Sequence, residues 1–280
     1  MIDLTTISSN LQQTSDGIWR SRSSSSISYP DWGNEACFQV EDASFWFRHR
    51  NACILEAVQQ FPPPGPVFDI GGGNGFVAKG MQDAGIDVVL VEPGEAGAVN
   101  AQRRGIRSVI CATLADAGLP PASMPAAGLF DVVEHMADDR EFLAMIHDHL
   151  VPQGKVYLTV PAYNALWSQE DTDAGHYRRY SRHSLHDLLS RSGFSVLFLT
   201  GFFQFLLLPI LVARVLPFRL GLARPLQSSE VAERMKEQHV VNDGLPADVL
   251  SWLLRRETKN IRRRRETRYG ASWLLVAGKT

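Results

Sequence analysis

Short apolar runs alternate with amphipathic stretches through the middle of the chain. The apolar runs are rich in β-branched residues and are bounded by glycine and proline, as buried strands are, while the stretches between them have helical periodicity. This alternation predicts an α/β fold with a mostly parallel sheet and helices on both of its faces. The expected strands are 67–70, 87–91, 108–111, one ending at Phe130 and 155–160, and the expected helices are 75–84, 94–104, 138–150 and 182–192.

The two ends of the chain follow other patterns. Residues 1–34 are polar and serine-rich, so a flexible arm is expected there. A helix is expected from Asp42 or Ser44 to Gln60, where a run of prolines stops it. The apolar runs 194–203 and 272–278 predict two further strands. The organisation expected is an arm (1–34), a core domain (35–203), a mostly helical insertion (204–270) and a final core strand (271–280).

Composition narrows the class of protein. The chain has 280 residues, 45% of them hydrophobic, with a formal net charge of −2, which argues against a general nucleic-acid binder. Its three cysteines, Cys37, Cys53 and Cys111, lack metal-ligand spacing, so no metal is expected. Because the cysteines are few and odd in number, and the first residues lack an apolar signal-type core, we expect a cytoplasmic protein.

The most informative string is VFDIGGGNGF at 67–76. Asp69 closes an apolar run, and glycines follow at Gly71, Gly72, Gly73 and Gly75. Glycine is needed where the backbone turns with positive φ or passes close to a ligand. The dinucleotide pattern G-x-G-x-x-G does not fit, because its third glycine would fall at Phe76. The spacing that fits is D-x-G-x-G-x-G.

A second acidic residue completes a nucleoside-binding pattern. The run 86–91 ends at Glu92, and in a doubly wound sheet the carboxyl end of this strand lies beside the glycine turn. An acidic side chain there can accept hydrogen bonds from both hydroxyls of a ribose. Glu92 therefore predicts a nucleoside ligand without identifying it.

The glycine string resembles the first motif of the class I S-adenosylmethionine (SAM) dependent methyltransferases. Four further strings resemble the branch of small-molecule methyltransferases related to ubiquinone and menaquinone biosynthesis: LFDVVEHMADD (129–139), VPAYNALWSQED (160–171), GHYRRYS (175–181) and GASWLLVAGK (270–279). The resemblance implies a Rossmann-like sheet of seven strands with an antiparallel last pair. It also implies SAM as methyl donor and S-adenosylhomocysteine as product.

The same resemblance assigns the cofactor site. It places Asp69 and the glycines under the methionine end and the ribose, and Glu92, followed by Pro93, at the ribose hydroxyls. Asp131 and Val132 lie beside the sulfonium and the acceptor. Many relatives have an aspartate near the adenine where this chain has Ala112 or Thr113. Adenine would then be held by the backbone, by Thr113 or by Asp116.

Candidates for catalysis follow the fourth and fifth expected strands. His135 is a candidate base, and the alternative is a helix-start histidine bonded to Asp138 or Asp139. His176 and Tyr180 are candidates for contact with the acceptor. The two arginines between them either bind an anionic acceptor or pair with Asp171 or Asp173 to fix the loop.

Arg50 lies on the helix that precedes the core, next to Trp46, Phe47 and Arg48. In many relatives this helix caps the cofactor, so Arg50 could reach the SAM carboxylate. The alternative is an aromatic helix face that covers the sheet, with solvated arginines.

The insertion carries an apolar segment and a basic one. Residues 196–213 contain no charge, but Thr200, Gly201, Gln204 and Pro209 interrupt the run, which argues against a transmembrane helix. We expect 204–216 to cover the acceptor pocket or to lie on a membrane surface. Residues 255–268 hold eight basic and two acidic side chains, which would suit anionic lipid at the inner membrane surface or simply form a solvated helix face. RNA is not expected to bind.

The function expected is methyl transfer from SAM to a small acceptor at oxygen, nitrogen or carbon, and an apolar insertion would suit a lipophilic acceptor. One rival is a nicotinamide-dependent oxidoreductase, which would need a glycine at position 76. The other is a non-catalytic SAM-binding or membrane-associated regulatory protein. It would keep Asp69, Gly73 and Glu92 but would tolerate loss of His135, His176 and Tyr180.

Overall fold

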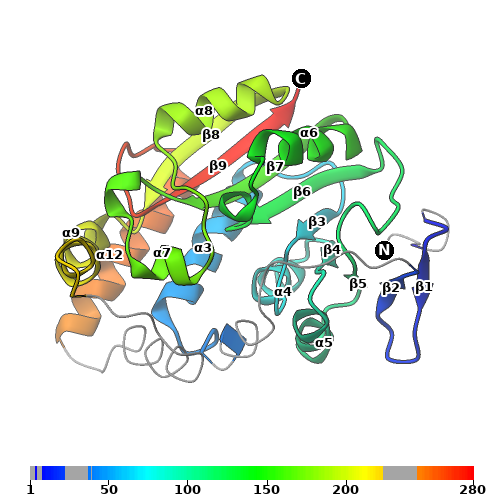
Figure 1. Ribbon diagram of the computed structural model, residues 1–280, viewed down its shortest axis with the longest axis horizontal. Coiled ribbons are helices and arrows are strands. Elements are labelled where there is room, and N and C mark those ends of the chain that lie inside the picture. Colours follow the sequence, from blue (N-terminus) through cyan, green and yellow to red (C-terminus); the bar gives the residue numbers. More distant parts are fainter. Residues whose placement is uncertain (1–3, 5–7, 23–36, 39, 223–244) are drawn as a thin grey trace.

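A computed structural model describes residues 4, 8–22, 37–38, 40–222 and 245–280 (Figure 1). In it, the seven expected strands are adjacent in a nine-stranded sheet, and two further strands lie at one edge. The sheet order is β1-β2-β5-β4-β3-β6-β7-β9-β8. The strands that carry the site, Val67–Ile70 (β3), Val88–Val91 (β4), Val109–Cys111 (β5), Met124–Phe130 (β6) and Leu150–Pro161 (β7), pair in parallel.

The last two core strands are antiparallel, as expected. Ser272–Lys279 (β9) lies between β7 and Phe194–Phe202 (β8) and runs against both of them. The final eight residues of strand therefore pair on both sides, although they are almost the last residues of the chain.

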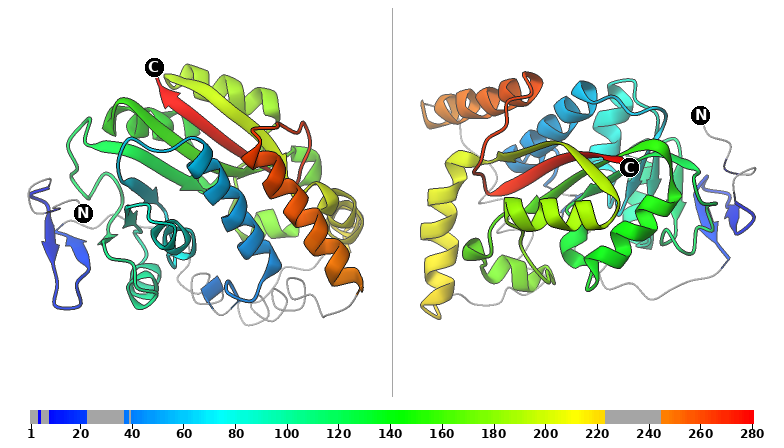
Figure 2. Two further views of the ribbon diagram at one scale, coloured as in Figure 1. Left: turned by 180° about the vertical axis from the view of Figure 1, so that it is seen from behind. Right: turned by 90° about the horizontal axis from the view of Figure 1, so that it is seen from above.

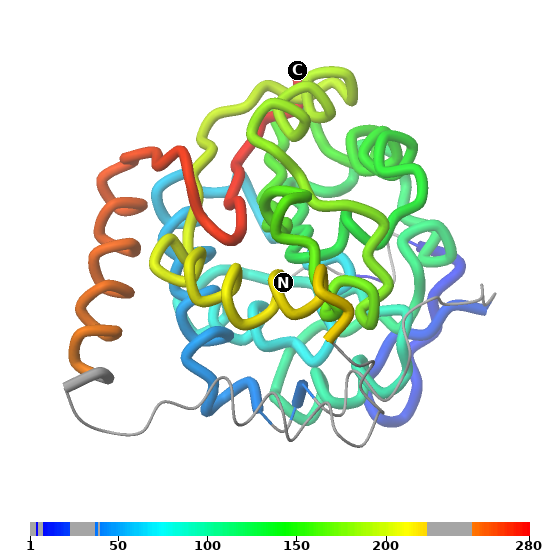
Figure 3. The backbone as a smooth tube through the Cα atoms, turned by 60° about the vertical axis from the view of Figure 1, so that its left-hand side comes forward, coloured from blue at the N-terminus to red at the C-terminus, as the bar shows by residue number. Residues whose placement is uncertain are grey.

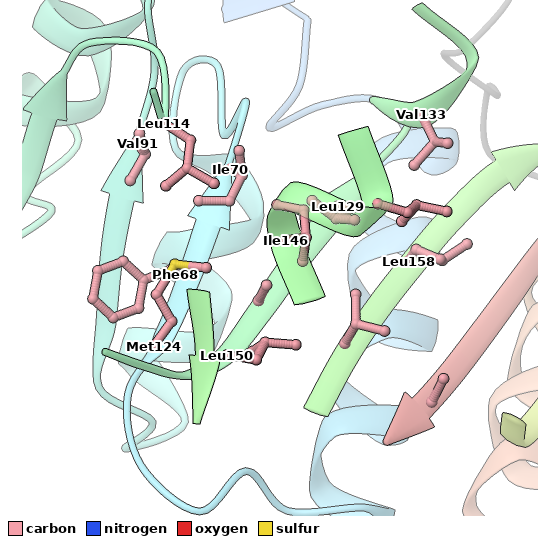
Figure 4. Close-up of a cluster of buried hydrophobic side chains, with 14 of the residues drawn as sticks. Phe68, Ile70, Val91, Leu114, Met124, Leu129, Val133, Ile146, Leu150 and Leu158 are labelled. Carbon is pink, nitrogen blue, oxygen red and sulfur yellow. The ribbon is translucent and has the colours of Figure 1, made fainter. Parts of the chain in front are cut away.

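Helices cover the two faces of the sheet, because the strands alternate between two buried clusters. One face carries Asp139–His149 (α6) and Arg182–Arg191 (α8), and Figure 4 shows part of this cluster, with Ile146 of α6 over Leu129 and Leu158. The other face carries Phe45–Gln60 (α3), Phe76–Asp83 (α4), Glu95–Arg103 (α5) and Leu245–Arg262 (α12) (Figure 2). Tyr157 of β7 points into this second cluster, while its neighbours Val156 and Leu158 point into the first.

The beginning of the chain departs from the expected flexible arm. Residues Leu11–Gln13 (β1) and Trp19–Ser21 (β2) form a hairpin, and β2 pairs in parallel with β5, which raises the strand count from the expected seven to nine. Polar contacts fix the hairpin: the Ser8 hydroxyl donates to the Ala117 carbonyl at 2.6 Å, and the Ser21 hydroxyl donates to the Asp116 carbonyl at 2.9 Å. Residues 23–34 of the expected arm lie outside the described residues, as do 1–3 and 5–7.

The insertion is helical where the structure describes it. A continuous helical segment comprises Gln204–Leu206 (η3), Leu207–Ile210 (α9), a π-helical turn Leu211–Val215 (η4) and Leu216–Arg219 (α10). Residues 223–244 lie outside the described part, and α12 then packs along α3. Among the described residues, no helix is both long enough and apolar enough to cross a bilayer.

Candidate cofactor and acceptor site

The glycine turn after β3 brings its backbone close to two neighbouring elements. Gly71, Gly73 and Gly75 have φ of 68°, 52° and 75°, in the left-handed region that glycine adopts most readily. A Cβ on Gly71 would lie 2.9 Å from a Val132 methyl group, and one on Gly72 would lie 2.9 Å from the Asp69 carboxylate. The turn is therefore a cradle of bare backbone at the carboxyl end of the sheet, as a nucleoside site requires.

Glu92 follows β4 and fixes this turn. Its carboxylate accepts from the Gly73 amide at 2.8 Å and from the Gly94 amide at 2.7 Å, so it spans the glycine turn and the start of α5, with Pro93 between. A carboxylate offers about four lone-pair sites, and two backbone donors do not by themselves exhaust them. The expected contact with ribose hydroxyls is compatible with this arrangement.

Asp69 lies directly under the glycine turn. It is 1% exposed, and its Oδ2 has no hydrogen-bond partner among the described residues. Burial raises the pKa of this carboxyl to about 7, the Arg50 charge opposes the rise and Glu92 adds to it. A buried acceptor of this kind fits a ligand that brings a cation or an N–H donor, as the methionine ammonium of SAM would.

Arg50 joins α3 to the end of β6. Its guanidinium forms a salt bridge with Asp131, with Nε 2.5 Å from Oδ2, and donates to the Phe130 carbonyl at 2.8 Å. Thr159 of β7 donates to the other Asp131 oxygen at 3.0 Å. Asp131 has a φ of 57°, a left-handed conformation that these contacts hold. The structure therefore gives Arg50 a protein partner, Asp131, and the contact with the SAM carboxylate stays a prediction.

The residues expected at the adenine lie after β5. Ala112 is buried, and the Thr113 hydroxyl donates to the Asp116 carboxylate at 2.8 Å. Thr113 and Asp116 were alternative candidates for the adenine contact, and the structure shows that they bond to each other. The Asp116 carbonyl accepts from Ser21 of the hairpin, so β2 supports this loop.

A second cluster lies on the acceptor side, just past β6. Val133–His135 (η1) carries Glu134 and His135, and the following loop brings His176 against them. The rings of His135 and His176 meet edge to face, with centroids 4.8 Å apart. One ligand atom each from Glu134, His135 and His176 lies within 4.8 Å of the other two, a spacing that could also hold a metal ion.

Burial shifts the pKa values of two side chains in this cluster, Glu134 and His135. Glu134 is buried, and neither carboxylate oxygen has a hydrogen-bond partner among the described residues. Burial and then the nearby Asp131 raise the pKa of Glu134 well above its ordinary value. Burial, followed by the nearby His176, lowers the pKa of His135 to about 4. Burial therefore favours the uncharged form of both Glu134 and His135.

Asp171 orients His176. The short helix Gln169–Asp173 (α7) begins with a capping box between Ser168 and Asp171. Asp171 is 2.8 Å from Nδ1 of His176 and 2.7 Å from Nε of Arg179. Burial alone would raise the pKa of Asp171, but these two hydrogen bonds bring it below its ordinary range. Arg179 thus takes the structural role that the sequence left as one alternative.

Arg178 and Tyr180 face the core behind the cluster. Arg178 forms a salt bridge with Asp139 at 2.7 Å, and the Tyr180 hydroxyl donates to the same carboxylate at 2.8 Å. Tyr180 is buried in the first hydrophobic cluster, where burial and then Asp139 raise its pKa. The expected acceptor contact does not fit these surroundings, and the contacts support a packing role for Tyr180 instead.

Sequence reasoning overlooked Glu134 and the pairing of Asp171 with His176. The signal for Glu134 was its place in the string VVEH directly after an apolar strand, where a buried acid is costly unless it has a use. No such signal exists for Asp171, because its pairing depends on the turn of α7.

Comparisons with known proteins identify the family and the fold of the chain. Residues 46–198, more than half of the chain, match the family described as methyltransferase domain. A probable S-adenosylmethionine-dependent methyltransferase of Mycolicibacterium smegmatis is 27% identical over 160 residues, which span 56% of this chain and 62% of that protein. The chain thus matches less than two thirds of that relative.

Solved structures share the fold. A SAM-dependent methyltransferase of Thermotoga maritima, described as a possible histamine N-methyltransferase, superposes with a TM-score of 0.53 at 17% identity, covering 89% of this chain and 95% of that one. A phosphoethanolamine N-methyltransferase of Haemonchus contortus, solved with SAM, gives 0.54 at 18% identity, covering 90% of this chain and 57% of that one. Nothing in these comparisons favours an oxidoreductase. The chain belongs to the methyltransferase domain family, and its fold is of the Rossmann-like α/β class.

Proposed function

We propose that this methyltransferase acts on a small acceptor whose oxygen or nitrogen nucleophile loses its proton to His176. The observation that carries this proposal is the pairing of His176 with buried, ionised Asp171 beside His135 and Glu134. These groups follow β6 and β7, whose carboxyl ends lie at the same edge of the sheet as the glycine turn.

The hydrogen bonds and charges of the cluster favour His176 over His135 as the base. Ionised Asp171 accepts a hydrogen bond from the N–H at Nδ1 of His176. The lone pair of the His176 ring then lies on its other nitrogen, Nε2. The neutral ring of His135, and the Glu134 carboxyl whose raised pKa favours the protonated form, can bind the acceptor without an opposing charge. A positioned base of this kind accelerates transfer by about 10²–10⁴-fold.

SAM supplies an electrophilic methyl group on a positively charged sulfur. We assign its methionine end and ribose to Asp69, the glycines 71–75, Glu92 and Pro93, and its adenine to Ala112 and Thr113. Asp131 and Val132 lie between this side and the acceptor cluster, since Val132 touches Gly71 and Asp131 precedes it. The task of the protein is then orientation and exclusion of water, which account for much of such an acceleration.

The resemblance to the ubiquinone and menaquinone branch supports a ring hydroxyl as the acceptor group. A phenol loses its proton more readily than an alcohol, so a histidine suffices as base. Residues 164–176 are called the acceptor loop. The apolar helical segment 204–222 is joined to this loop by the Arg214–Glu170 pair, at 3.5 Å, and by Arg219, which donates to the Ala165 carbonyl at 2.9 Å. An apolar element at this place supports a lipophilic acceptor.

The test is turnover of SAM to S-adenosylhomocysteine with a panel of phenols, amines and enolisable acids, including prenylated ring compounds. For the accepted compound, we expect His176→Asn to lower kcat by about 10²–10⁴-fold while calorimetry shows unchanged SAM affinity. His186→Asn, an exposed histidine on α8, is the matched control and should leave kcat unchanged. Wild-type kcat in both His176→Asn and His135→Asn would instead indicate catalysis by orientation alone.

The same cluster allows a sharp test of metal dependence. Its spacing could hold a divalent ion, whereas the proposed mechanism needs none. We expect dialysis against EDTA to leave kcat unchanged. If EDTA abolished the activity and added Mg²⁺ or Zn²⁺ restored it, these side chains would be metal ligands and not groups that transfer a proton.

A further inference from the structure

An exposed apolar face covers one end of the molecule, on the insertion and away from the sheet. Leu208, Val212, Leu216 and Leu220 recur every four residues along the helical segment 204–222, so they lie along one side of it. Leu208 and Leu220 are 68% and 71% exposed. The opposite side of the segment packs on the core through Ile210 and Val215, which are buried. The exposed leucines are therefore not part of the core.

Helix α12 lies at the same end of the molecule as the segment 204–222 (Figure 3). It carries a second stripe of exposed side chains. Val249, Trp252, Arg256 and Lys259 are spaced as one side of a helix, and Val249 and Trp252 are 58% and 53% exposed. The opposite side of α12 contributes Glu257, which accepts from the amides of Phe203 at 2.9 Å and Gln204 at 2.7 Å. This contact holds α12 against the start of the apolar segment. The two stripes together are called the insertion face.

Among the described residues, basic side chains outnumber acidic ones on the insertion face. Residues 204–222 contain Arg214 and Arg219 and no acidic residue. On α12, Arg255 and Lys259 are exposed, and Arg256 lies over the Trp252 ring at 5.6 Å. Of the acids nearby, Asp248 is exposed in the first turn of α12, Glu257 is buried, and Glu266 pairs with Arg182. Protruding leucines, one tryptophan and a basic rim are the features of a segment that lies in the interface of an anionic bilayer.

We propose that the insertion face docks on the surface of an anionic lipid bilayer, with the leucines of 204–222 in the headgroup region and the basic side chains of α12 at the phosphates. A second copy of this chain is a poorer occupant, because an isologous contact would bring the same basic residues toward each other. The proposal does not depend on the identity of the methyl acceptor. It places the acceptor loop 164–176 next to the lipid, through the contacts of Arg214 and Arg219.

The test is flotation of the full chain with vesicles of phosphatidylcholine alone and of phosphatidylcholine with phosphatidylglycerol at a three-to-one ratio. We expect binding only to the anionic vesicles, and weaker binding at high salt. Val212→Glu together with Leu216→Glu should abolish it. Leu197→Glu, an exposed leucine on β8 that is 46% exposed, is the matched control and should bind as the wild type does.

A second double variant tests the basic side chains and leaves the apolar segment 204–222 unchanged. Arg255→Ala together with Lys259→Ala should weaken partitioning by about fivefold for each charge removed. Unchanged SAM affinity and melting temperature verify that the variants fold. Absence of wild-type binding to anionic vesicles, or equal binding by the Val212→Glu, Leu216→Glu variant, would overturn the proposal. A dimer in sedimentation velocity that this variant dissociates would also overturn it and identify a second copy as the occupant.

Discussion

At the scale of single residues, the glycine turn restricts most strongly which residues the sequence can have. Gly71 and Gly85 both have positive φ, 68° and 81°, but only Gly71 would place a Cβ against a neighbour, at 2.9 Å from Val132. We expect each alanine variant to lower the free energy of unfolding by about 1–2 kcal/mol, because both adopt a left-handed backbone. Only Gly71→Ala should also weaken SAM binding, measured by calorimetry. Equal SAM affinity in the two variants would show that the turn does not approach the ligand.

Asp69 predicts an unusual dependence of stability on pH. Its pKa is raised from 3.8 to about 7 in the folded chain. Between these values the unfolded chain loses a proton that the folded chain keeps, so the free energy of unfolding falls as pH rises, by up to about 4 kcal/mol in all. Asp69→Asn cannot ionise, so this variant should lose that fall and be more stable than the wild type at pH 8. It should also bind SAM less tightly, a trade between stability and function.

Urea unfolding at pH 5 and pH 8 measures this effect, and the difference between variant and wild type isolates Asp69 from other titrating groups. Asp148→Asn, whose side chain is 77% exposed, is the control and should shift stability equally at both pH values. A parallel shift in Asp69→Asn would mean that this carboxyl is ionised throughout the range. The titration of His135, whose pKa is lowered to about 4, acts in the opposite direction and is present in both proteins.

At the scale of elements, Glu257 fastens the insertion to the core. It is buried, accepts from the Phe203 and Gln204 amides and lies 2.8 Å from Nε2 of His49 on α3. Removing one partner of such a buried group costs about 3–5 kcal/mol, so Glu257→Ala should lower the free energy of unfolding by that amount. Glu266→Ala breaks a surface pair with Arg182, at 38% and 41% side-chain exposure, and should cost no more than about 1 kcal/mol. Thermal unfolding measures both variants. Equal losses of stability in Glu257→Ala and Glu266→Ala would mean that Glu257 does not anchor α12.

The elements differ in how far the sequence predicts them. Every expected core strand is present within a few residues, because β3, β4 and β9 are apolar runs bounded by breakers. The hairpin β1–β2 was missed, since LQQ and WRS show no alternation and have one apolar residue each, and β5 offers β2 an edge. The position of Glu92 beside the glycine turn was predictable from its place after a strand. The contact of Arg50 with Asp131 depends on tertiary structure, and that of Asp171 with His176 depends on the turn of α7, which the sequence pattern did not predict.

At the scale of the whole molecule, the insertion, the last strand and the site share one core. Ser272–Lys279 (β9) is paired on both sides, and α12 packs on α3, the helix that supplies Arg50 to the site. The second buried cluster contains Ile261 of α12, Ile54 of α3 and Val276 of β9. Residues 203–271 separate β8 from β9 in the sequence, but α12 within them packs into the same core as the two strands. An element that shares a core with the site should respond to the ligand as the site does.

Because the core is shared, we expect SAM to slow hydrogen exchange in the insertion and in the sheet to the same extent. A ligand that binds only the folded chain stabilises it by about 2.7 kcal/mol at 100 times its Kd. Amides that exchange by global unfolding should then exchange about 100-fold more slowly, in β9 and in the buried turn of α12 around Ile261 alike. Hydrogen exchange followed by mass spectrometry measures both segments in one experiment, and NADH at the same concentration is the control that should protect neither. Protection of β9 without protection of α12 would show that the insertion opens on its own, because an element that unfolds independently gains nothing from a ligand bound to the rest of the chain.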